Sequence, residues 1–329
     1  MQNILVFHAG ALGDLVNTLP AFHALRGRFK DASFTAVGNA AFLSLFEAAG
    51  IFEKVVSLET TGMHALFGEG RISTELVDFL SSYELAVTWM RSLRLRERLC
   101  EQGLSVLAFS EQFPPPAGAG HVADYMGRPL REIGINEFPE FPALCLPREI
   151  KDNSPRFPGL LIHPGSGSPY KNFPPELPAR CGLEIARKGG LEIGMVGGPA
   201  DDAPCGELEK FLGNDLKAGF SGLSTIELAG LLDSAALVLG NDSGVLHLAG
   251  ALGTPTMALF GPTDPDIWGV KQKNAVNLRS PCDCAPCSPE IMRNCTDREC
   301  LRSLTAEEVI SRGLELAAKE LRPTLSTVP

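Results

Sequence analysis

The feature that most constrains the fold is a unit that recurs along the chain: a short apolar run, a turn rich in small residues, and a helical stretch. Apolar runs stand at 3–8, 33–37, 54–58, 84–89 and 105–109, and again at 159–163, 191–196, 235–239 and 256–260. Strands that alternate with helices form parallel sheets with helices on both faces. Because the proline-rich segment 134–158 separates the two sets, it reads as a linker. The sequence predicts an α/β protein with two Rossmann-like lobes, residues 1–150 and 151–329.

The composition excludes several classes of protein. The 329 residues, of which 44% are hydrophobic and 21% charged, are typical of globular domains. The net charge of −10 argues against a nucleic-acid partner, because phosphate backbones require a basic surface. No apolar stretch approaches the roughly 20 residues that span a bilayer, and the N-terminus lacks the basic start of a signal peptide. We therefore expect a cytoplasmic protein.

The first apolar run leads into Gly-Ala-Leu-Gly at 10–13 and then Asp14, where we expect a helix to begin. The loop lacks the Gly-x-Gly-x-x-Gly fingerprint and no acidic residue ends the second run, which disfavours a nicotinamide or flavin cofactor. Open α/β sheets bind ligands at the carboxyl ends of their strands. Asp14 is therefore either a helix N-cap or a functional carboxylate.

Arginines gather after the fourth apolar run, at Arg91, Arg94, Arg96 and Arg98. Guanidinium groups suit carboxylate and phosphate partners. Arg91 and Arg94 lie nearest the strand end and are candidates for binding an anionic acceptor. The alternative is a solvated helix face, which is favoured for Arg96 and Arg98.

In the second half, the stretch 240–251 (Gly-Asn-Asp-Ser-Gly-Val-Leu-His-Leu-Ala-Gly-Ala) turns a buried run directly into a helix. The free N–H groups of a helix start form an anion site, and Asp242, Ser243 and His247 surround this one. His247 either donates to a phosphate or is a structural histidine on the inner face of the helix. The stretch predicts a bound phosphate.

Two further loops offer ligand-binding residues. Lys171 follows a Gly/Ser loop at 165–168, where small residues allow a phosphate to approach the backbone; a plain surface lysine is the alternative. Asp201 follows the run 191–196 and suits either a ribose diol or a helix N-cap.

Four motifs stand in one order: Gly-x-x-Gly-Asp ending at Asp14, His-Pro-Gly-Ser-Gly-Ser before Lys171, Asn-Asp-Ser-Gly-x-x-His ending at His247, and Phe-Gly-Pro-Thr-Asp-Pro at 260–265. Together they resemble the bacterial lipopolysaccharide heptosyltransferases, glycosyltransferase family 9. The resemblance implies the two-lobed GT-B fold with the active site in the cleft between the lobes. It also implies an inverting, metal-independent transfer of heptose from ADP-heptose to an inner-core acceptor, with no cofactor required.

The resemblance also implies roles for single residues. Asp14 corresponds to the catalytic base, Gly13 to an acceptor contact beside it, and Lys171 to the lysine that binds the diphosphate. The positions that correspond to donor contacts are Gly165, Ser166, Asp201, Leu223, Asp242, Ser243, Gly244 and His247. The loop that holds Gly165 and Ser166 is one residue longer than in some members of the family. A lipid-linked acceptor implies peripheral contact with the cytosolic face of the inner membrane.

Five of the nine cysteines crowd between 282 and 300. Their spacing is like that of a metal site, with Cys284, Cys287, Cys295 and Cys300 as candidate zinc ligands. Disulfides are the weaker alternative in a cytosolic protein. Members of the resembled family carry similar cysteines without an established metal role, so a metal-free cluster is the primary prediction.

Rival functions remain open at this level. One is another two-lobed nucleotide-sugar enzyme, either a transferase of a different sugar or an epimerase. A second is a protein that binds a nucleotide sugar without catalysis.

Overall fold

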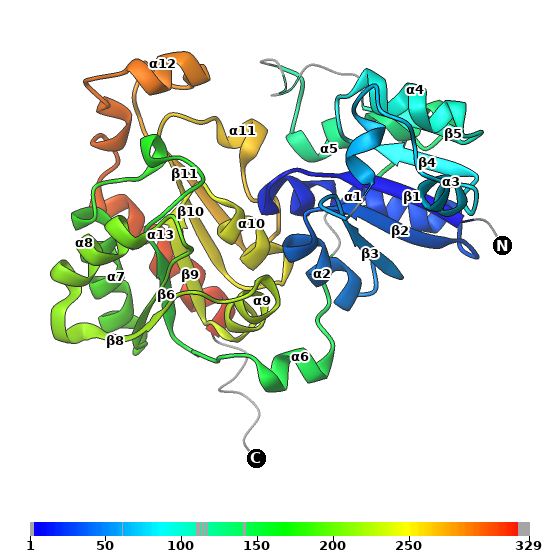
Figure 1. The fold of residues 1–329 in the computed structure, drawn as a ribbon. Helices are drawn as coiled ribbons and strands as arrows, with labels where there is room; N and C mark the ends of the chain where they lie inside the picture. Colours follow the sequence, from blue (N-terminus) through cyan, green and yellow to red (C-terminus); the bar gives the residue numbers. More distant parts are fainter. Residues whose placement is uncertain are drawn as a thin grey trace. The chain divides into compact units, whose positions relative to one another are not determined.

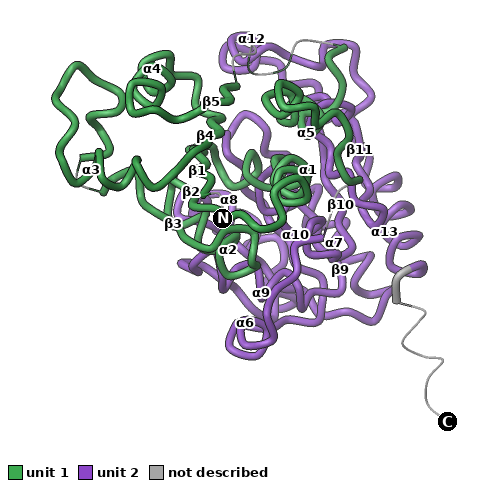
Figure 2. Tube along the Cα trace, turned by 90° about the vertical axis from the view of Figure 1, so that its right-hand side faces the viewer, with its two compact units in different colours: residues 1–142 green, residues 143–329 purple. Residues whose placement is uncertain are grey.

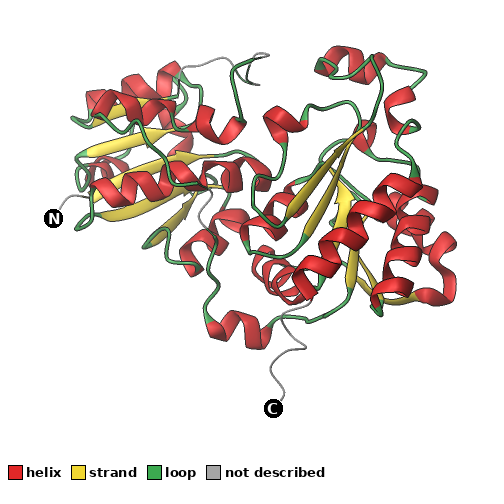
Figure 3. Cartoon of the chain, turned by 180° about the vertical axis from the view of Figure 1, so that it is seen from behind, coloured by secondary structure: helices red, strands yellow, loops and turns green. Residues whose placement is uncertain are grey.

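The chain folds into two compact units, residues 1–142 and 143–329 (Figure 2). The structure is a computed structural model and describes residues 3–60, 62–109, 113, 115, 118–140 and 143–321. Each unit contains one sheet, and helices lie on either side of it (Figure 3). The α/β fold class with two Rossmann-like lobes is therefore confirmed.

The sheet of the first unit has five strands in the order β3-β2-β1-β4-β5 (Figure 1), and all neighbours are parallel. Its strands are β1 (Asn3–His8), β2 (Ser33–Gly38), β3 (Lys54–Ser57), β4 (Leu85–Thr88) and β5 (Ser105–Ala108). Its α-helices are α1 (Leu12–Arg28), α2 (Ala40–Ala48), α3 (Thr74–Leu80), α4 (Leu93–Glu101) and α5 (Val122–Met126). β1 is central, so its apolar residues are buried by strands on both sides and helices on both faces.

The sheet of the second unit has six strands in the order β11-β10-β9-β6-β7-β8 (Figure 1), again all parallel. They are β6 (Leu160–His163), β7 (Ile193–Val196), β8 (Leu216–Phe220), β9 (Leu237–Asn241), β10 (Thr256–Phe260) and β11 (Ala275–Arg279). The sequence analysis missed β8 and β11. Both are edge strands, and their partly exposed residues lack the continuous apolar run that marks the inner strands.

The helices of the second unit are α6 (Arg148–Asn153), α7 (Glu176–Gly189), α8 (Asp202–Leu212), α9 (Thr225–Ser234), α10 (Gly244–Ala251), α11 (Pro265–Trp268), α12 (Pro289–Asn294) and α13 (Ala306–Leu321). α13 packs against α7. The Thr305 hydroxyl caps this last helix by accepting from the Glu308 N–H at 3.3 Å. None of the helices in the described ranges is long and apolar enough to cross a membrane.

The strand orders determine where each unit can bind a ligand. The order reverses between β1 and β4 in the first sheet, and between β6 and β9 in the second. At such a point neighbouring loops run to opposite faces of the sheet and leave a crevice at the carboxyl ends of the strands. The loop after β1 carries Asp14. The loops after β6 and β9 carry Lys171 and Asp242.

Candidate functional site

The two motifs at the switch point of the second unit meet through an ion pair. Lys171 Nζ lies 3.0 Å from Asp242 Oδ2, and both side chains are largely buried, at 17% and 7% exposure. The Thr263 hydroxyl donates to the same oxygen at 2.8 Å. A carboxylate held in this way orients the ammonium group of Lys171. Asp242 thus forms an ion pair with Lys171, and Lys171 is not the plain surface lysine of the alternative interpretation.

Asn241, the last residue of β9, holds the loop that leads to Lys171. It is 2% exposed. Its Nδ2 donates to the Pro164 carbonyl at 2.7 Å, and its Oδ1 accepts from the Phe173 N–H at 3.2 Å. One side chain therefore fixes both ends of the loop. The sequence analysis did not assign Asn241 or Thr263 a role, although both stand inside motifs that it singled out.

The start of α10 has the properties of an anion site. Ser243 is its N-cap residue but makes no side-chain capping bond. Its hydroxyl is buried, and within the described residues it has no hydrogen-bond partner. The first N–H groups of a helix also lack carbonyl partners inside that helix, and the helix dipole favours a negative charge there. Ser243 and Gly244 thus present unused donors directly after Asp242, the residue that pairs with Lys171.

His247 lies one turn further along α10 and is 6% exposed. Burial lowers its pKa from the ordinary value, the nearby Lys171 lowers it further, and Asp242 and a hydrogen bond with the Trp268 backbone oppose this shift. The ring is therefore neutral near pH 7, and it lies near enough to Lys171 and Asp242 for their charges to act on it. The hydrogen bond with the Trp268 backbone is typical of a structural histidine. The nearby charge of Lys171 is consistent with a phosphate contact, so that role stays a prediction.

Gly165 and Asp201 come together although they follow different strands. A Cβ on Gly165 would stand 1.9 Å from Asp201 Oδ1. Asp201 Oδ2 accepts from the Gly198 N–H at 2.8 Å, and the carboxylate makes no capping bond to α8. Asp201 therefore stands at the N-cap position of α8 but lacks the side-chain capping bond that the alternative interpretation required.

Ser166 and Leu223 complete the positions expected to contact the donor. The Ser166 hydroxyl accepts from the Ser168 N–H at 3.2 Å and lies 2.6 Å from Asn172 Oδ1. It therefore shapes its own loop. Leu223 is half-buried in the turn that follows β8.

Asp14 lies in the first turn of α1, directly after the loop that follows β1. The helix begins at Leu12, two residues before the start expected from the sequence, so Asp14 is its third residue and not an N-cap. Its Oδ2 accepts from the Ala11 N–H at 3.1 Å, which stabilises the helix start. A Cβ on Gly10 would stand 2.8 Å from the Asp14 Cβ. The glycine of this loop thus allows a close approach that no larger residue would permit.

The other residues expected to bind the acceptor also lie in the first unit. Gly13 is the second residue of α1. Arg94 forms ion pairs with Glu69 at 3.1 Å and with Glu97 at 3.2 Å. Arg91 is exposed just before α4. The Arg94 guanidinium already has two carboxylate partners. Its role in binding an acceptor stays a prediction, and it requires the acceptor to replace Glu69 or Glu97.

The protein is expected to lose stability as the pH falls below 6.5. Burial lowers the pKa of His8 from 6.5 to about 3, so between these values the unfolded chain binds a proton that the folded chain does not. The stabilisation is present above pH 6.5 and is lost on acidification, by about 2 kcal/mol between pH 7 and 5 for His8 alone. Burial lowers the pKa of His163 and His247 in the same direction.

Urea unfolding at pH 7 and pH 5 measures this loss, and in His8→Gln the part due to His8 should be missing. An equal pH dependence in the variant and the wild type would contradict the assignment.

The cysteine-rich segment 282–300 contains free thiols. Cys284 Sγ lies 3.6 Å from Cys282 Sγ, and Cys295 Sγ accepts from the Arg298 N–H at 3.3 Å. Burial, followed by the charges of the neighbouring thiols, raises the pKa of Cys300 to about 12. In the described part of the chain, no group of three or more His, Cys, Asp or Glu side chains is arranged to hold a metal ion. That finding includes the zinc candidates Cys284, Cys287, Cys295 and Cys300.

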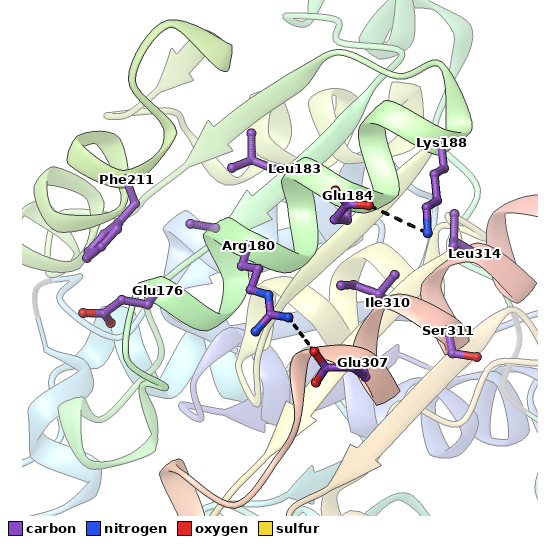
Figure 4. Close-up of a pocket in the computed structure, with 11 residues that line it drawn as sticks. Glu176, Arg180, Leu183, Glu184, Lys188, Phe211, Glu307, Ile310, Ser311 and Leu314 are labelled. Atoms are coloured by element: carbon purple, nitrogen blue, oxygen red, sulfur yellow. Dashed lines mark hydrogen bonds and ion pairs between the residues drawn. The ribbon is translucent and has the colours of Figure 1, made fainter.

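A surface hollow of about 860 Å³ lies between α7 and α13 (Figure 4). Four of its five charged residues form two ion pairs, Arg180 with Glu307 and Lys188 with Glu184. The lining comes from α7, α8 and α13 and includes none of the loops at the carboxyl ends of the strands. This hollow is therefore a separate feature from the site around Lys171.

Comparison with known proteins identifies the second unit. The model of glycosyltransferase family 9 (heptosyltransferase) matches residues 147–296. The second unit is a glycosyltransferase family 9 domain. The resemblance inferred from the sequence motifs is thereby confirmed, and the family 9 match includes Lys171 and the start of α10.

Curated relatives match this chain over part of its length. Lipopolysaccharide heptosyltransferase 1 of Pseudomonas aeruginosa is 30% identical over 148 residues, which are 45% of this chain and 40% of the relative. Lipopolysaccharide heptosyltransferase 1 of Salmonella typhimurium is 35% identical over 102 residues, 31% of this chain and 29% of the relative. The matched segment thus spans well under half of the length of these relatives.

Solved structures resemble the chain over nearly its full length. The ADP-heptose lipopolysaccharide heptosyltransferase II of E. coli has a TM-score of 0.74 at 16% identity, over 98% of this chain and 100% of the other. The E. coli heptosyltransferase WaaC with ADP has a TM-score of 0.70 at 17% identity, over 96% of this chain and 100% of the other. At these identities the likeness establishes the shared two-domain fold.

Proposed function

We propose that this protein is an inverting, metal-independent heptosyltransferase that moves heptose from ADP-heptose to an inner-core acceptor of lipopolysaccharide. The observation that carries the proposal is the built anion site in the family 9 domain. The Lys171 ammonium, the unused Ser243 hydroxyl and the N–H groups at the start of α10 belong to the segments that follow β6 and β9, the two strands at the switch point. The names of the curated relatives support heptose as the transferred sugar, and the name of the E. coli heptosyltransferase II structure supports ADP-heptose as the donor.

The proposed chemistry divides between the two units. Transfer with inversion requires a base on the acceptor hydroxyl and stabilisation of the departing ADP. Asp14 would accept the proton as the hydroxyl oxygen attacks the anomeric carbon of the donor. As the bond between that carbon and the diphosphate breaks, Lys171 and the N-terminus of α10 would stabilise the charge on the leaving group. Asp242 would hold Lys171 in place, since a carboxylate repels phosphate.

The remaining donor positions would contact the nucleoside. We assign the ribose to Asp201 and one face of the adenine to Leu223. Gly165 and Ser166 would present the loop backbone to the diphosphate. The acceptor is assigned to the loop at Gly13, and a lipid-linked acceptor would bring the enzyme to the cytosolic face of the inner membrane.

The test is a donor screen with the full-length protein. ADP-heptose, other ADP-sugars, UDP-sugars and GDP-sugars are each incubated with a panel of core acceptors, and the products are read by mass. The expected result is the addition of one heptose from ADP-heptose alone. Transfer or epimerisation of another sugar would replace the proposal with a different GT-B nucleotide-sugar enzyme. ADP-heptose that binds without turnover on any acceptor would indicate a non-catalytic binding protein.

Gly165→Ala is expected to weaken ADP binding about tenfold. The new Cβ would overlap Asp201 Oδ1 at 1.9 Å, so the loop or the carboxylate must move, and overpacking of this kind costs about 1–3 kcal/mol. The matched control is Gly167→Ala in the same loop, where a Cβ meets nothing within 4 Å. Calorimetric titration with ADP measures both variants, and equal affinities would contradict the role of this contact.

A further inference from the structure

His8 and Thr18 connect the two ends of the loop that carries Asp14. Both are buried, at 2% and 0% exposure. The Gly10 N–H donates to His8 Nδ1 at 3.2 Å, and His8 Nε2 lies 3.2 Å from the Thr18 hydroxyl. That hydroxyl donates to the Asp14 carbonyl oxygen at 2.7 Å. The chain of bonds therefore runs from Gly10 through two side chains to Asp14.

The directions of these bonds determine the tautomer of His8. Nδ1 accepts from an N–H, so it carries no proton, and in a neutral ring the proton must then lie on Nε2. Nε2–H donates to Thr18 Oγ1, whose own hydrogen is used on the Asp14 carbonyl. The pKa of His8, lowered by burial to about 3, agrees with a ring that stays neutral. With a proton on Nδ1, two donors would face each other and the hydrogen bond from the Gly10 N–H would be lost.

Two aromatic side chains surround the His8 ring. The ring packs against Phe22 at a centroid distance of 6.1 Å and against Trp89 at 6.0 Å. Trp89 is fixed in turn, because its Nε1–H donates to the Met126 carbonyl at 2.8 Å. A Cβ on Gly10 would also stand 2.8 Å from His8 Cε1. The loop, the imidazole and the first turn of α1 are thus in direct contact with one another.

A histidine also ends the central strand of the second unit, but it acts differently. His163, the last residue of β6, bonds through Nδ1 to the Val196 carbonyl of β7 at 3.0 Å. In that unit Asn241, not the histidine, fixes the loop after the strand. A buried histidine at this position therefore need not support its loop, and the contacts of His8 are a particular feature of the first unit.

We propose that His8, acting through Thr18, is a positioning residue that holds Asp14 in the orientation needed for proton abstraction. The inference rests on the proposed function, in which Asp14 is the base. His8 itself exchanges no proton with the substrate. It sets the place of the Asp14 backbone, and with it the direction in which the carboxylate points.

The first test compares Thr18→Val with Thr18→Ser. Valine keeps the shape of threonine but removes the hydroxyl, so the Asp14 carbonyl and the His8 Nε2–H lose their shared partner. We expect kcat to fall about 10- to 100-fold, as for a small misplacement of a catalytic group, with the KM for the donor unchanged. Serine restores the hydroxyl and should restore most of the rate. If valine and serine variants turn over alike, or if the loss lies in the donor KM, the proposal is wrong.

A double mutant separates positioning from general damage. Because Thr18 is proposed to act through Asp14, Thr18→Val should not lower the residual rate of Asp14→Asn any further. A full additional loss would overturn the inference while leaving Asp14 as the base. Absence of transfer by the wild type would instead overturn the proposed function and the inference with it.

The network is also tested without activity, by nitrogen NMR of labelled histidine in the full-length protein. The ring signal of His8 is identified by its absence in His8→Gln. We expect it to report an unprotonated Nδ1 and a protonated Nε2 at every pH from 8 to 5. This measurement covers the case in which Thr18→Val fails to fold. A protonated Nδ1, or a charged ring at pH 6, would overturn the proposal.

Discussion

Asp14→Asn is expected to lower the kcat of heptosyl transfer by about 10²- to 10⁴-fold, the usual contribution of a general base, and to leave the affinity for ADP unchanged. The amide oxygen of asparagine can still accept from the Ala11 N–H, so the start of α1 stays formed. The amide cannot take the proton of the acceptor hydroxyl. Kinetics with saturating donor, together with calorimetric titration of ADP, measure the two quantities separately.

The matched control for this prediction is Asp124→Asn. Asp124 is the third residue of α5, as Asp14 is of α1, and it is exposed. Removing either charge weakens a helix start by a similar amount, about 0.3–1 kcal/mol. Only the loss at Asp14 should affect turnover. Near-normal transfer by Asp14→Asn would exclude this residue as the base and restrict it to helix capping.

Lys171→Met is expected to reduce kcat/KM by about 10²- to 10³-fold, a loss comparable to that of one preorganised donor at a site where charge develops. Methionine approximates the length of lysine but carries no charge, so the departing diphosphate loses its cation. The same change leaves Asp242, only 7% exposed, without its ion pair. Some loss of stability should accompany the loss of rate, because an uncompensated buried charge is costly.

Two further variants separate these effects. In Lys171→Met combined with Asp242→Asn no charge is left unpaired, so the stability should recover while the rate stays low. Lys188→Met removes a lysine that is 47% exposed on α7 and should leave both quantities near the wild type. If the double variant recovered its rate as well, Lys171 would be a structural residue rather than a contact to the leaving group.

The inner strands and the helices between them could be predicted from the sequence because their signal is local. β1, β6, β9 and β10 are buried on both faces, so each appears as a continuous apolar run. β8 and β11 could not be predicted in this way. Lys217 and Gly219 interrupt the apolar residues of β8, and Asn277 interrupts those of β11, whereas the edge strands β3 and β5 keep short apolar runs. The start of α1 was misplaced by two residues because Asp14 resembles an N-cap by residue type alone.

The residues of the candidate site could be predicted from the sequence, but the contacts between them could not. The sequence singled out Lys171 and Asp242 separately, each from the small residues and turns around it. Their ion pair joins residues 71 positions apart, and only the pairing of β6 with β9 brings those loops together. The support from Asn241 and Thr263 depends on the same arrangement. Local sequence patterns do not predict contacts between residues so far apart in the chain.

The sequence by itself determined the fold class, the loops that carry the candidate site residues and the family of the second unit, because hydrophobic period, turn residues and motif order are properties of short stretches. The tertiary structure alone decided which of the candidate side chains already have partners. Arg94 is held by Glu69 and Glu97, and Asp201 by the Gly198 N–H, whereas the Ser243 hydroxyl has no partner among the described residues. Hydrogen bonds between distant residues form only once burial removes water as the competing partner, and burial is a property of the assembled fold.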